Sequence, residues 1–193
     1  MNYTELLAAA LALAGIGLMV LRKNFGWWLN FASCLLYAGL FFRSKLYGDG
    51  GLQLFFAVMQ VSGWLNWKKH SKHKGLLIRE MSLDAVWNTL LFTLGGSLLL
   101  GYLLYSNTDA RAPWIDAFCT MGSITGQWLQ VARYRENWWY WVVVNLIYVP
   151  LYVQMNLYLT AVLYGVFLGL AIAGMMRWNN ILKQQKEVLQ DLS

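Results

Sequence analysis

Polar and aromatic side chains recur at helical spacing within an apolar segment of the second half of the chain. Trp138, Trp141, Asn145 and Tyr148 are separated by three or four residues, which would place them on one face of a helix. Indole N–H groups and a carboxamide can hydrogen-bond a polar ligand, and aromatic faces can attract a positively charged ring. We interpret this face as a binding surface for a small polar or cationic ring.

Carboxamides and further aromatic side chains form similar stripes in other apolar segments. Gln60, Gln127 and Asn145 are expected at similar depth in a membrane. A single carboxamide would indicate a hydrogen bond between helices, worth about 0.6 kcal/mol. Three of them beside Trp and Tyr favour a cavity for a polar ligand, although the role between helices stays open. The candidate substrate-binding residues are Trp138, Trp141, Asn145, Gln60, Trp64, Gln127, Tyr148 and Tyr37.

Residues for other chemistries are not grouped in the sequence. No charged side chain is expected at mid-membrane, where a proton or sodium relay would place one, so we predict uncoupled transport. Cys34 and Cys119 lie in apolar segments without Cys-x-x-Cys spacing and are expected to be small buried side chains. His70 and His73 lie in a basic loop without acidic or cysteine ligands, so we predict no metal site, no cofactor and no enzymatic activity.

The composition indicates the elements that position these residues. The chain is 59% hydrophobic and 12% charged, with 11 Trp and a mean hydropathy of +0.43, whereas globular domains carry roughly 25% charged residues. The net charge of +6 does not indicate nucleic acid, because the charges lie in short runs between apolar segments. A helix needs about 20 apolar residues to cross a membrane. We predict about seven transmembrane helices over 5–21, 27–42, 52–67, 87–105, 113–132, 138–154 and 157–176.

The distribution of Lys and Arg predicts the orientation of these helices. If the segments alternate, one side holds Arg43, Lys45 and Arg111, and the other side holds the remaining 12 of the 15 basic residues. The positive-inside rule then places the N-terminus outside and the C-terminus in the cytoplasm. Glu5 and Asp116 begin their helices on the outside, where we expect solvated or helix-capping groups.

The chain aligns on itself without a gap at an offset of 111 residues, which places 27–67 on 138–178. Shared hydrophobicity does not explain the recurrence of Trp, Tyr and Gly at matched positions. The identical pairs include Gly15/Gly126, Arg22/Arg133, Trp27/Trp138, Trp28/Trp139, Tyr37/Tyr148, Gly63/Gly174 and Trp67/Trp178. Because the offset covers four helices, both halves would have the same orientation.

These observations predict an all-α integral membrane fold with two parallel three-helix repeats joined by a linker helix (3+1+3). The single transporter domain spans 1–193. Its parts are repeat 1 (about 5–67), the linker helix (about 87–105), repeat 2 (about 113–178) and a cytoplasmic tail (179–193) that ends in a short amphipathic helix at the membrane surface. Such symmetry suits alternating access to a substrate site between the repeats.

Tryptophans at the ends of the predicted helices are expected at the membrane interface, where indole rings are enriched. These are Trp27, Trp28, Trp67, Trp138, Trp139 and Trp178. Trp138 is a candidate for the binding site as well, because it shares the polar face. The repeat pairs Trp141 with Asn30 and Asn145 with Cys34, and we expect the positions that break the symmetry to touch the substrate.

The second half of the chain resembles the PnuC family of nicotinamide riboside transporters. It contains the pattern E-x-W-x-x-W-x-x-x-N as ENWWYWVVVN, followed by a Leu-Tyr and a final Gly and Trp. The first half is similar to the family in KLYGDGGLQLFFAVMQVSGWLNW, but has GWLNW where the family often has Gly-Trp-Tyr-x-Trp. The resemblance covers nearly the whole chain.

The resemblance to this family, and to the SWEET-like superfamily, implies facilitated diffusion of nicotinamide riboside across the cell inner membrane, with trapping by a cytosolic kinase. It also implies a site lined by Trp138, Trp141, Asn145, Gln60, Trp64 and Gln127. Because similar proteins carry other vitamins, a thiamine or other vitamin transporter is the alternative. A membrane enzyme and an assembly subunit fit less well. The expected partners are a small-molecule substrate and the lipid bilayer, with a homo-oligomer possible and no nucleic acid.

Overall fold

The computed structural model describes residues 3–43, 47–70, 77–107, 112–154 and 158–190, and it is helical almost throughout. Within these residues the helices are α1 (Tyr3–Val20), α2 (Gly26–Arg43), α3 (Tyr47–His70), α4 (Leu83–Asn107), α5 (Pro113–Val131), α6 (Asn137–Gln154) and α7 (Tyr158–Gln190). The predicted all-helical fold and the number of helices are confirmed. The predictions for His73, Lys45 and Arg111 fall outside the described residues.

Helix α7 differs most from its prediction, because it runs for 33 residues to Gln190 without a break. The segment 177–190 contains no Gly or Pro and is rich in Lys, Gln, Glu and Leu, which are good helix formers. Residues 179–190 of the predicted tail are therefore a direct continuation of the last apolar helix.

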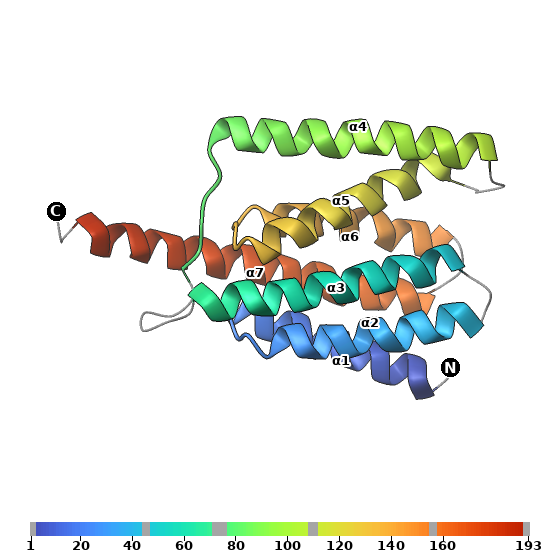
Figure 1. Cartoon of the computed structure of the whole chain (residues 1–193), viewed down its shortest axis with the longest axis horizontal. Helices are drawn as coiled ribbons and strands as arrows, with labels where there is room; N and C mark the ends of the chain where they lie inside the picture. Colours follow the sequence, from blue (N-terminus) through green and yellow to red (C-terminus); the bar gives the residue numbers. More distant parts are fainter. Residues whose placement is uncertain (1–2, 44–46, 71–76, 108–111, 155–157, 191–193) are drawn as a thin grey trace.

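Consecutive helices run in alternating directions along a common axis (Figure 1). The contacts between them close a ring of six helices: α1 packs on α2, α2 on α3, α3 on α5, α5 on α6, α6 on α7, and α7 on α1. Helix α4 stands outside this ring and, in the described part of the chain, packs against α5 alone. The ring therefore joins α1–α3 to α5–α7 through two contacts, α3 with α5 and α7 with α1.

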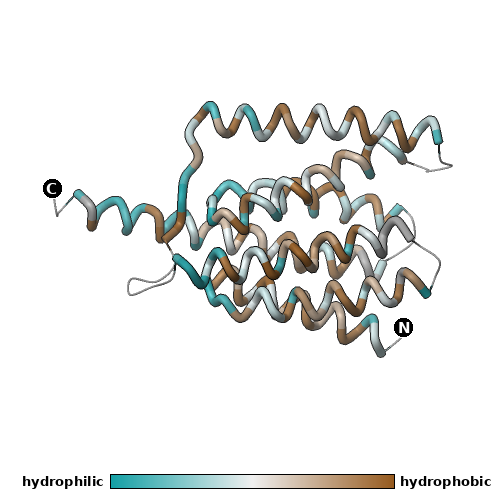
Figure 2. Tube along the Cα trace, in the orientation of Figure 1, coloured by the Kyte–Doolittle hydropathy of each residue, from teal (hydrophilic) through white to brown (hydrophobic). Residues whose placement is uncertain are grey.

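Three helices are long and apolar enough to cross a membrane by length and composition: α1, α4 and the part of α7 from Ala161 to Val188. Helices α2, α5 and α6 are as long as α1, at 18 or 19 residues, but their Trp, Tyr, Asn and Gln side chains lower the hydropathy. Figure 2 shows hydrophobic residues along the bundle and α4, and hydrophilic residues along the extension of α7 and the segment that enters α4.

Helices α1 and α5 end in the same way, at the matched residues Arg22 and Arg133. Both arginines have a positive φ, of 58° and 66°. The Arg22 N–H donates to the Met19 carbonyl at 2.9 Å and the Lys23 N–H to the Leu18 carbonyl at 2.8 Å, which is the Schellman pattern of a helix C-terminus. The corresponding bonds at Arg133 and Tyr134 have lengths of 3.1 and 3.0 Å. Each turn reverses the chain into the next helix of the ring.

The segment that leads into α4 is held against the turn between α5 and α6. The Arg79 N–H donates to the Arg133 carbonyl at 2.9 Å, and the Arg135 N–H donates to the Arg79 carbonyl at 3.0 Å. The Arg79 guanidinium lies 4.4 Å from the ring centre of Tyr134, and Ile78 is buried in the core. These contacts connect the start of α4 to the second half of the ring.

Candidate functional site

Four tryptophans form a continuous chain across the interior of the ring. The ring centres of Trp27 and Trp67 lie 5.1 Å apart at 88°, and those of Trp138 and Trp178 lie 5.5 Å apart at 88°. Trp67 and Trp178 join the two pairs at 5.8 Å. Each half of the chain thus supplies one edge-to-face pair, and the pairs meet in the middle.

The burial of these four side chains corrects the prediction that Trp27, Trp67, Trp138 and Trp178 lie at the membrane interface. They are among the largest fully buried side chains of the protein. Edge-to-face packing of their rings and burial of the apolar surface of these rings stabilise this arrangement. Trp28 and Trp139, the neighbours of Trp27 and Trp138, are 39% and 41% exposed and remain predicted interfacial residues.

Two matched glycines make room for the tryptophan chain. A Cβ atom on Gly63 would overlap the ring of Trp27, and a Cβ atom on Gly174 would overlap the ring of Trp138. The helices of each half can therefore approach only because these positions lack a side chain. Gly63 and Gly174 are matched by the offset of 111 residues, and each lies against the matched tryptophan of its own half, which explains why the Gly and Trp positions recur together.

Three of the four indole N–H groups in the tryptophan chain have no acceptor among the described residues. Trp67 Nε1 donates to the backbone carbonyl of Gln130 at 3.0 Å, which connects α3 to α5. The Nε1 atoms of Trp27, Trp138 and Trp178 are buried without a partner within the described residues. A buried donor that lacks an acceptor costs about 1–3 kcal/mol, so these three groups have hydrogen-bonding capacity that the described residues do not use.

The candidate carboxamides are buried in the same ring. Gln60 and Gln127 are 5% and 3% exposed, and Gln60 Oε1 and Gln127 Nε2 have no partner in the part of the chain described. Asn145 is also buried, but its Nδ2 donates to the carbonyl of Trp141 on its own helix at 2.6 Å. The bond of Asn145 lies within α6 and does not connect two helices.

The remaining candidates lie in different surroundings. Trp141 is partly buried, packs against the tryptophan core and lies close to Gly126. The ring of Trp64 lies 5.2 Å from that of Trp28, and the ammonium group of Lys68 lies 4.8 Å above it. Trp64 lies beside Trp28 and, like Trp141, packs against the tryptophan core.

Tyr148 belongs to a tyrosine cluster away from the tryptophans. Its ring lies 5.5 Å from that of Tyr152 and 5.0 Å from that of Tyr164. Tyr148 is ten residues beyond Trp138, which on a helix separates them by about 15 Å along the axis. Tyr37, its repeat counterpart, is partly buried on α2. The structure therefore divides the predicted face of α6 between two levels of the bundle.

A sulfur atom that the sequence reasoning missed connects three helices. Asn30 Nδ2 and Gln130 Nε2 each lie 3.3 Å from the sulfur of Met19, which accepts from both amides. Thioether sulfur is a weak acceptor, so these amides are only partly satisfied. The offset of 111 between Met19 and Gln130 was a signal in the sequence that these positions are equivalent, although it did not predict their contact.

A ring of helices with buried indole and carboxamide groups inside it defines a multi-pass helical membrane protein, the class to which solute transporters belong. The family model described as nicotinamide mononucleotide transporter matches residues 2–180. The chain therefore belongs to this family, and the resemblance to PnuC proteins is confirmed.

Several proteins of stated function are similar to this chain. The nicotinamide riboside transporter PnuC of Neisseria mucosa is 27% identical over 205 residues, covering 95% of this chain and 75% of the relative. PnuC of Escherichia coli K12 is 22% identical, with coverage of 96% and 88%. The riboflavin/roseoflavin transporter RibM of Streptomyces davaonensis is 24% identical, with coverage of 91% and 84%.

The fold is also that of a solved transporter. The crystal structure of the vitamin B3 transporter PnuC superposes with a TM-score of 0.78 at 21% identity and covers 94% of this chain and 83% of that one. The helical architecture derived above is thus shared with a vitamin transporter.

Proposed function

We propose that this protein takes up nicotinamide riboside across the cell inner membrane by facilitated diffusion. Membership of the family and the PnuC relatives support this substrate. The observation that carries the proposal is the set of buried, unpartnered groups inside the ring: the N–H groups of Trp27, Trp138 and Trp178, the Gln60 carbonyl and the Gln127 amide nitrogen.

These groups match the chemistry of the proposed substrate. Nicotinamide riboside has a carboxamide and ribose hydroxyls, which can pair with indole N–H groups and side-chain amides. Its positively charged pyridine ring can be attracted by the faces of the tryptophans. The candidate residues Trp138, Trp141, Asn145, Gln60, Trp64, Gln127, Tyr148 and Tyr37 would contribute at different stages, since the tyrosines and the tryptophans lie at different levels.

Alternating access between two parallel repeats would move the substrate. Trp67 and Trp178, and likewise Met19 and Gln130, are separated by the repeat offset and contact each other. Equivalent positions of two related halves meet only near the axis that relates them, so these contacts support a repeat axis through the tryptophan chain. The two connections between the halves, α3 with α5 and α7 with α1, are also equivalent under this offset. Rocking of one half against the other would open the site to either side.

The transport would be uncoupled, and phosphorylation of the substrate by a cytosolic kinase would prevent its return. The N-terminus would lie outside and the C-terminus in the cytoplasm, as the distribution of Lys and Arg indicates. In that orientation the tryptophan chain lies toward the cytoplasmic end of the bundle.

A second candidate is another vitamin with an aromatic ring, and the similarity to RibM favours riboflavin over thiamine within this group. A binding titration of the purified protein with nicotinamide riboside, riboflavin and thiamine tests both proposals. We expect saturable binding of nicotinamide riboside and at least tenfold weaker binding of the other two. Preferential binding of riboflavin or thiamine would exclude the primary proposal and support the second candidate.

A further inference from the structure

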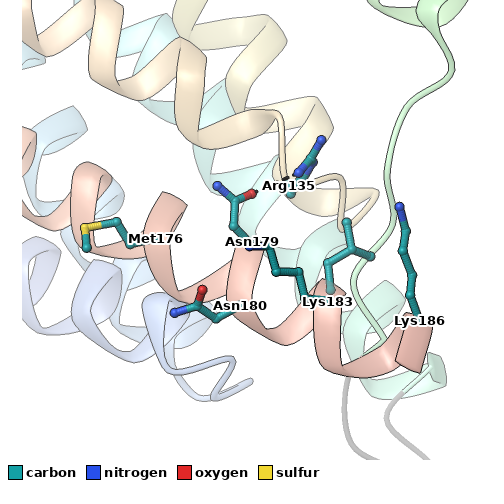
Figure 3. A pocket seen from close by; sticks show the side chains of 7 residues that line it. Arg135, Met176, Asn179, Asn180, Lys183 and Lys186 are labelled. Carbon is teal, nitrogen blue, oxygen red and sulfur yellow. Dashed lines mark hydrogen bonds between the residues drawn. The ribbon is translucent and has the colours of Figure 1, made fainter. Parts of the chain in front are cut away.

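A pocket separate from the tryptophan chain lies at the end of the bundle where α7 leaves it (Figure 3). It has a volume of about 450 Å³ and is lined by Arg135, from the turn before α6, and by residues between Met176 and Lys186 of α7. None of the candidate substrate-binding residues lines it. Transport as proposed above gives this pocket no role.

The pocket has an excess of positive charge. Arg135, Lys183 and Lys186 line it, and the carboxylate of Glu80 forms ion pairs with both Arg135 and Lys186. Arg135 Nε also lies 3.0 Å from the carboxylate of Glu136. Lys183 has no carboxylate within 4 Å among the described residues. Of the three cations that line the pocket, Arg135 and Lys186 form ion pairs and Lys183 forms none with the described residues.

Amide groups add neutral hydrogen-bonding capacity to the same pocket. Arg135 Nη1 donates to Asn179 Oδ1 at 3.2 Å, and Figure 3 shows these two side chains directed toward one another. With its oxygen turned to Arg135, Asn179 presents the amide N–H₂ group as a donor. The amide of Asn180 lies one residue further along the wall. The pocket therefore combines ammonium, guanidinium and amide donors.

The position of the pocket along α7 corresponds to the surface of a membrane. From Tyr158 to Met176 helix α7 has no charged residue, and these 19 residues extend for about 28 Å, close to the roughly 30 Å of hydrocarbon in a bilayer. Arg177 is the first charged residue, and the amides and lysines of the pocket follow it. Met176, at the rim, is 61% exposed. The pocket thus lies at the level of lipid headgroups.

Neighbouring charges increase the positive potential at this end. Burial and the positive charge of Arg177 lower the pKa of the Arg22 guanidinium. Arg177 directly follows Met176 of the pocket along α7, so this positive charge belongs to the same end of the bundle.

We propose that this pocket binds a phosphate group, presented either by the headgroup of an anionic phospholipid or by a soluble phosphate ester. Arginine and lysine bind phosphate oxygens through charge-assisted hydrogen bonds, and basic pockets at the cytoplasmic ends of transmembrane helices bind anionic headgroups. Lys183 is the principal ligand, because its charge is not compensated. Asn179 is the neutral donor beside it.

Thermal unfolding of the full-length protein in neutral detergent tests this proposal. The additions are phosphatidylglycerol, phosphatidylcholine, and sodium phosphate against sodium chloride at equal ionic strength. We expect phosphatidylglycerol, sodium phosphate or both to raise Tm in a saturable way, while phosphatidylcholine and sodium chloride do not. A response to the lipid alone identifies a headgroup site, and a response to phosphate identifies a site open to soluble esters.

Matched variants show whether the pocket itself is responsible. Lys183→Gln should weaken the apparent affinity at least fivefold, since one Lys near a membrane surface contributes about 1 kcal/mol. Lys69→Gln removes one exposed charge at the same end of the bundle, outside the pocket, and should leave the affinity unchanged. The absence of any response to both phosphate forms, or an equal loss in the two variants, would overturn the proposal.

Discussion

Buried hydrogen-bonding groups without partners are unfavourable for folding, and several of them lie on the helices of this ring. The amides of Gln60 and Gln127 and three indole N–H groups have this property. Their presence would be hard to explain if the bundle were only a packed core, because an apolar residue of similar size would be more stable there. The proposed binding site would explain them, since a ligand would supply the missing partners.

We therefore expect Gln127→Leu to leave the free energy of unfolding unchanged or to raise it by about 1 kcal/mol, while the uptake of nicotinamide riboside is lost. Thermal unfolding and uptake in cells with matched expression measure the two effects. Gln130→Leu on the same helix is the control, because it removes an amide that donates to Met19 and should lower stability. A stability loss in Gln127→Leu as large as that in Gln130→Leu would identify Gln127 as a structural residue.

Asn145 gives a similar test with a different bond. Its amide donates to the carbonyl of Trp141 within α6, a bond that contributes nothing to the packing of α6 on its neighbours. Asn145→Ala should therefore keep the expression level and Tm close to those of the wild type and reduce specific uptake at least tenfold. A parallel loss of folded protein and of uptake would show instead that Asn145 holds helices together.

The packing of whole helices depends on the glycines at the tryptophan chain. Gly174→Ala should destabilise the protein by about 1–3 kcal/mol, because the new methyl group overlaps the ring of Trp138 and forces α7 away from α6. Gly169→Ala on the same helix has open space and should be neutral or stabilising by up to about 1 kcal/mol. Thermal unfolding of the two variants measures the difference, and an equal effect would mean that α6 and α7 can separate at no cost.

The ion pairs of Glu80 connect the segment before α4 to α7 and to the turn before α6. The hydrogen bond from Lys186, together with the charges of Arg135 and Lys186, holds the pKa of the Glu80 carboxyl below its ordinary value of 4.5, against an opposing effect of burial. Because the pKa is lowered in the folded protein, the stabilisation is complete above pH 4.5 and is lost as the pH falls below it.

Glu80→Gln should therefore lower stability near neutral pH and have no effect in acid. The Glu80 side chain is partly exposed, so the difference should not exceed about 1 kcal/mol. Unfolding of the wild type and the variant between pH 3 and pH 7, set by the lowered pKa of Glu80, measures it. A constant difference across this range would exclude the ionised carboxylate as the cause.

The sequence predicts the positions of the helices better than the direction in which their tryptophan side chains point. Apolar segments predicted where the seven described helices lie, and the polar stripes that contain Gln60 and Gln127 predicted that these carboxamides are buried. The pattern could not tell that Trp27 and Trp138 face inward, because a tryptophan near a helix end suits the membrane interface and a helix contact equally well. The paired Gly63 and Gly174 carried that information, but their ring partners lie 36 residues earlier in the sequence, on the preceding helix, and the contact becomes visible only after folding.

The tail of α7 and the contact of Met19 with two amides were not predictable for a related reason. Hydropathy separates 157–176 from the charged residues that follow, but helix propensity continues through both. A thioether gives no polar signal in a sequence, so the sequence did not single out Met19. Its role depends on the arrangement of α1, α2 and α5 around it.

The sequence predicts no charged side chain at mid-membrane, and this leads to a prediction about energy coupling. Initial uptake of nicotinamide riboside into vesicles should not change when a protonophore is added or when sodium is replaced by potassium, because no carboxylate or imidazole is expected at the level of the site. A vesicle preparation with a known proton-coupled carrier serves as the control. Inhibition of more than half of the initial rate would contradict uncoupled transport.

Helix α4 does not belong to the ring, yet it determines how the ring can be made. Each half of the ring has three helices, and because the helices alternate in direction, three crossings leave the chain on the opposite side from its start. Because α4 adds one more crossing, α5 starts on the same side of the bundle as α1, and the two halves have the same orientation. A chain without α4 would insert α5–α7 in the opposite orientation. Removal of this peripheral helix would therefore disturb biosynthesis, through the topology of the newly made polypeptide.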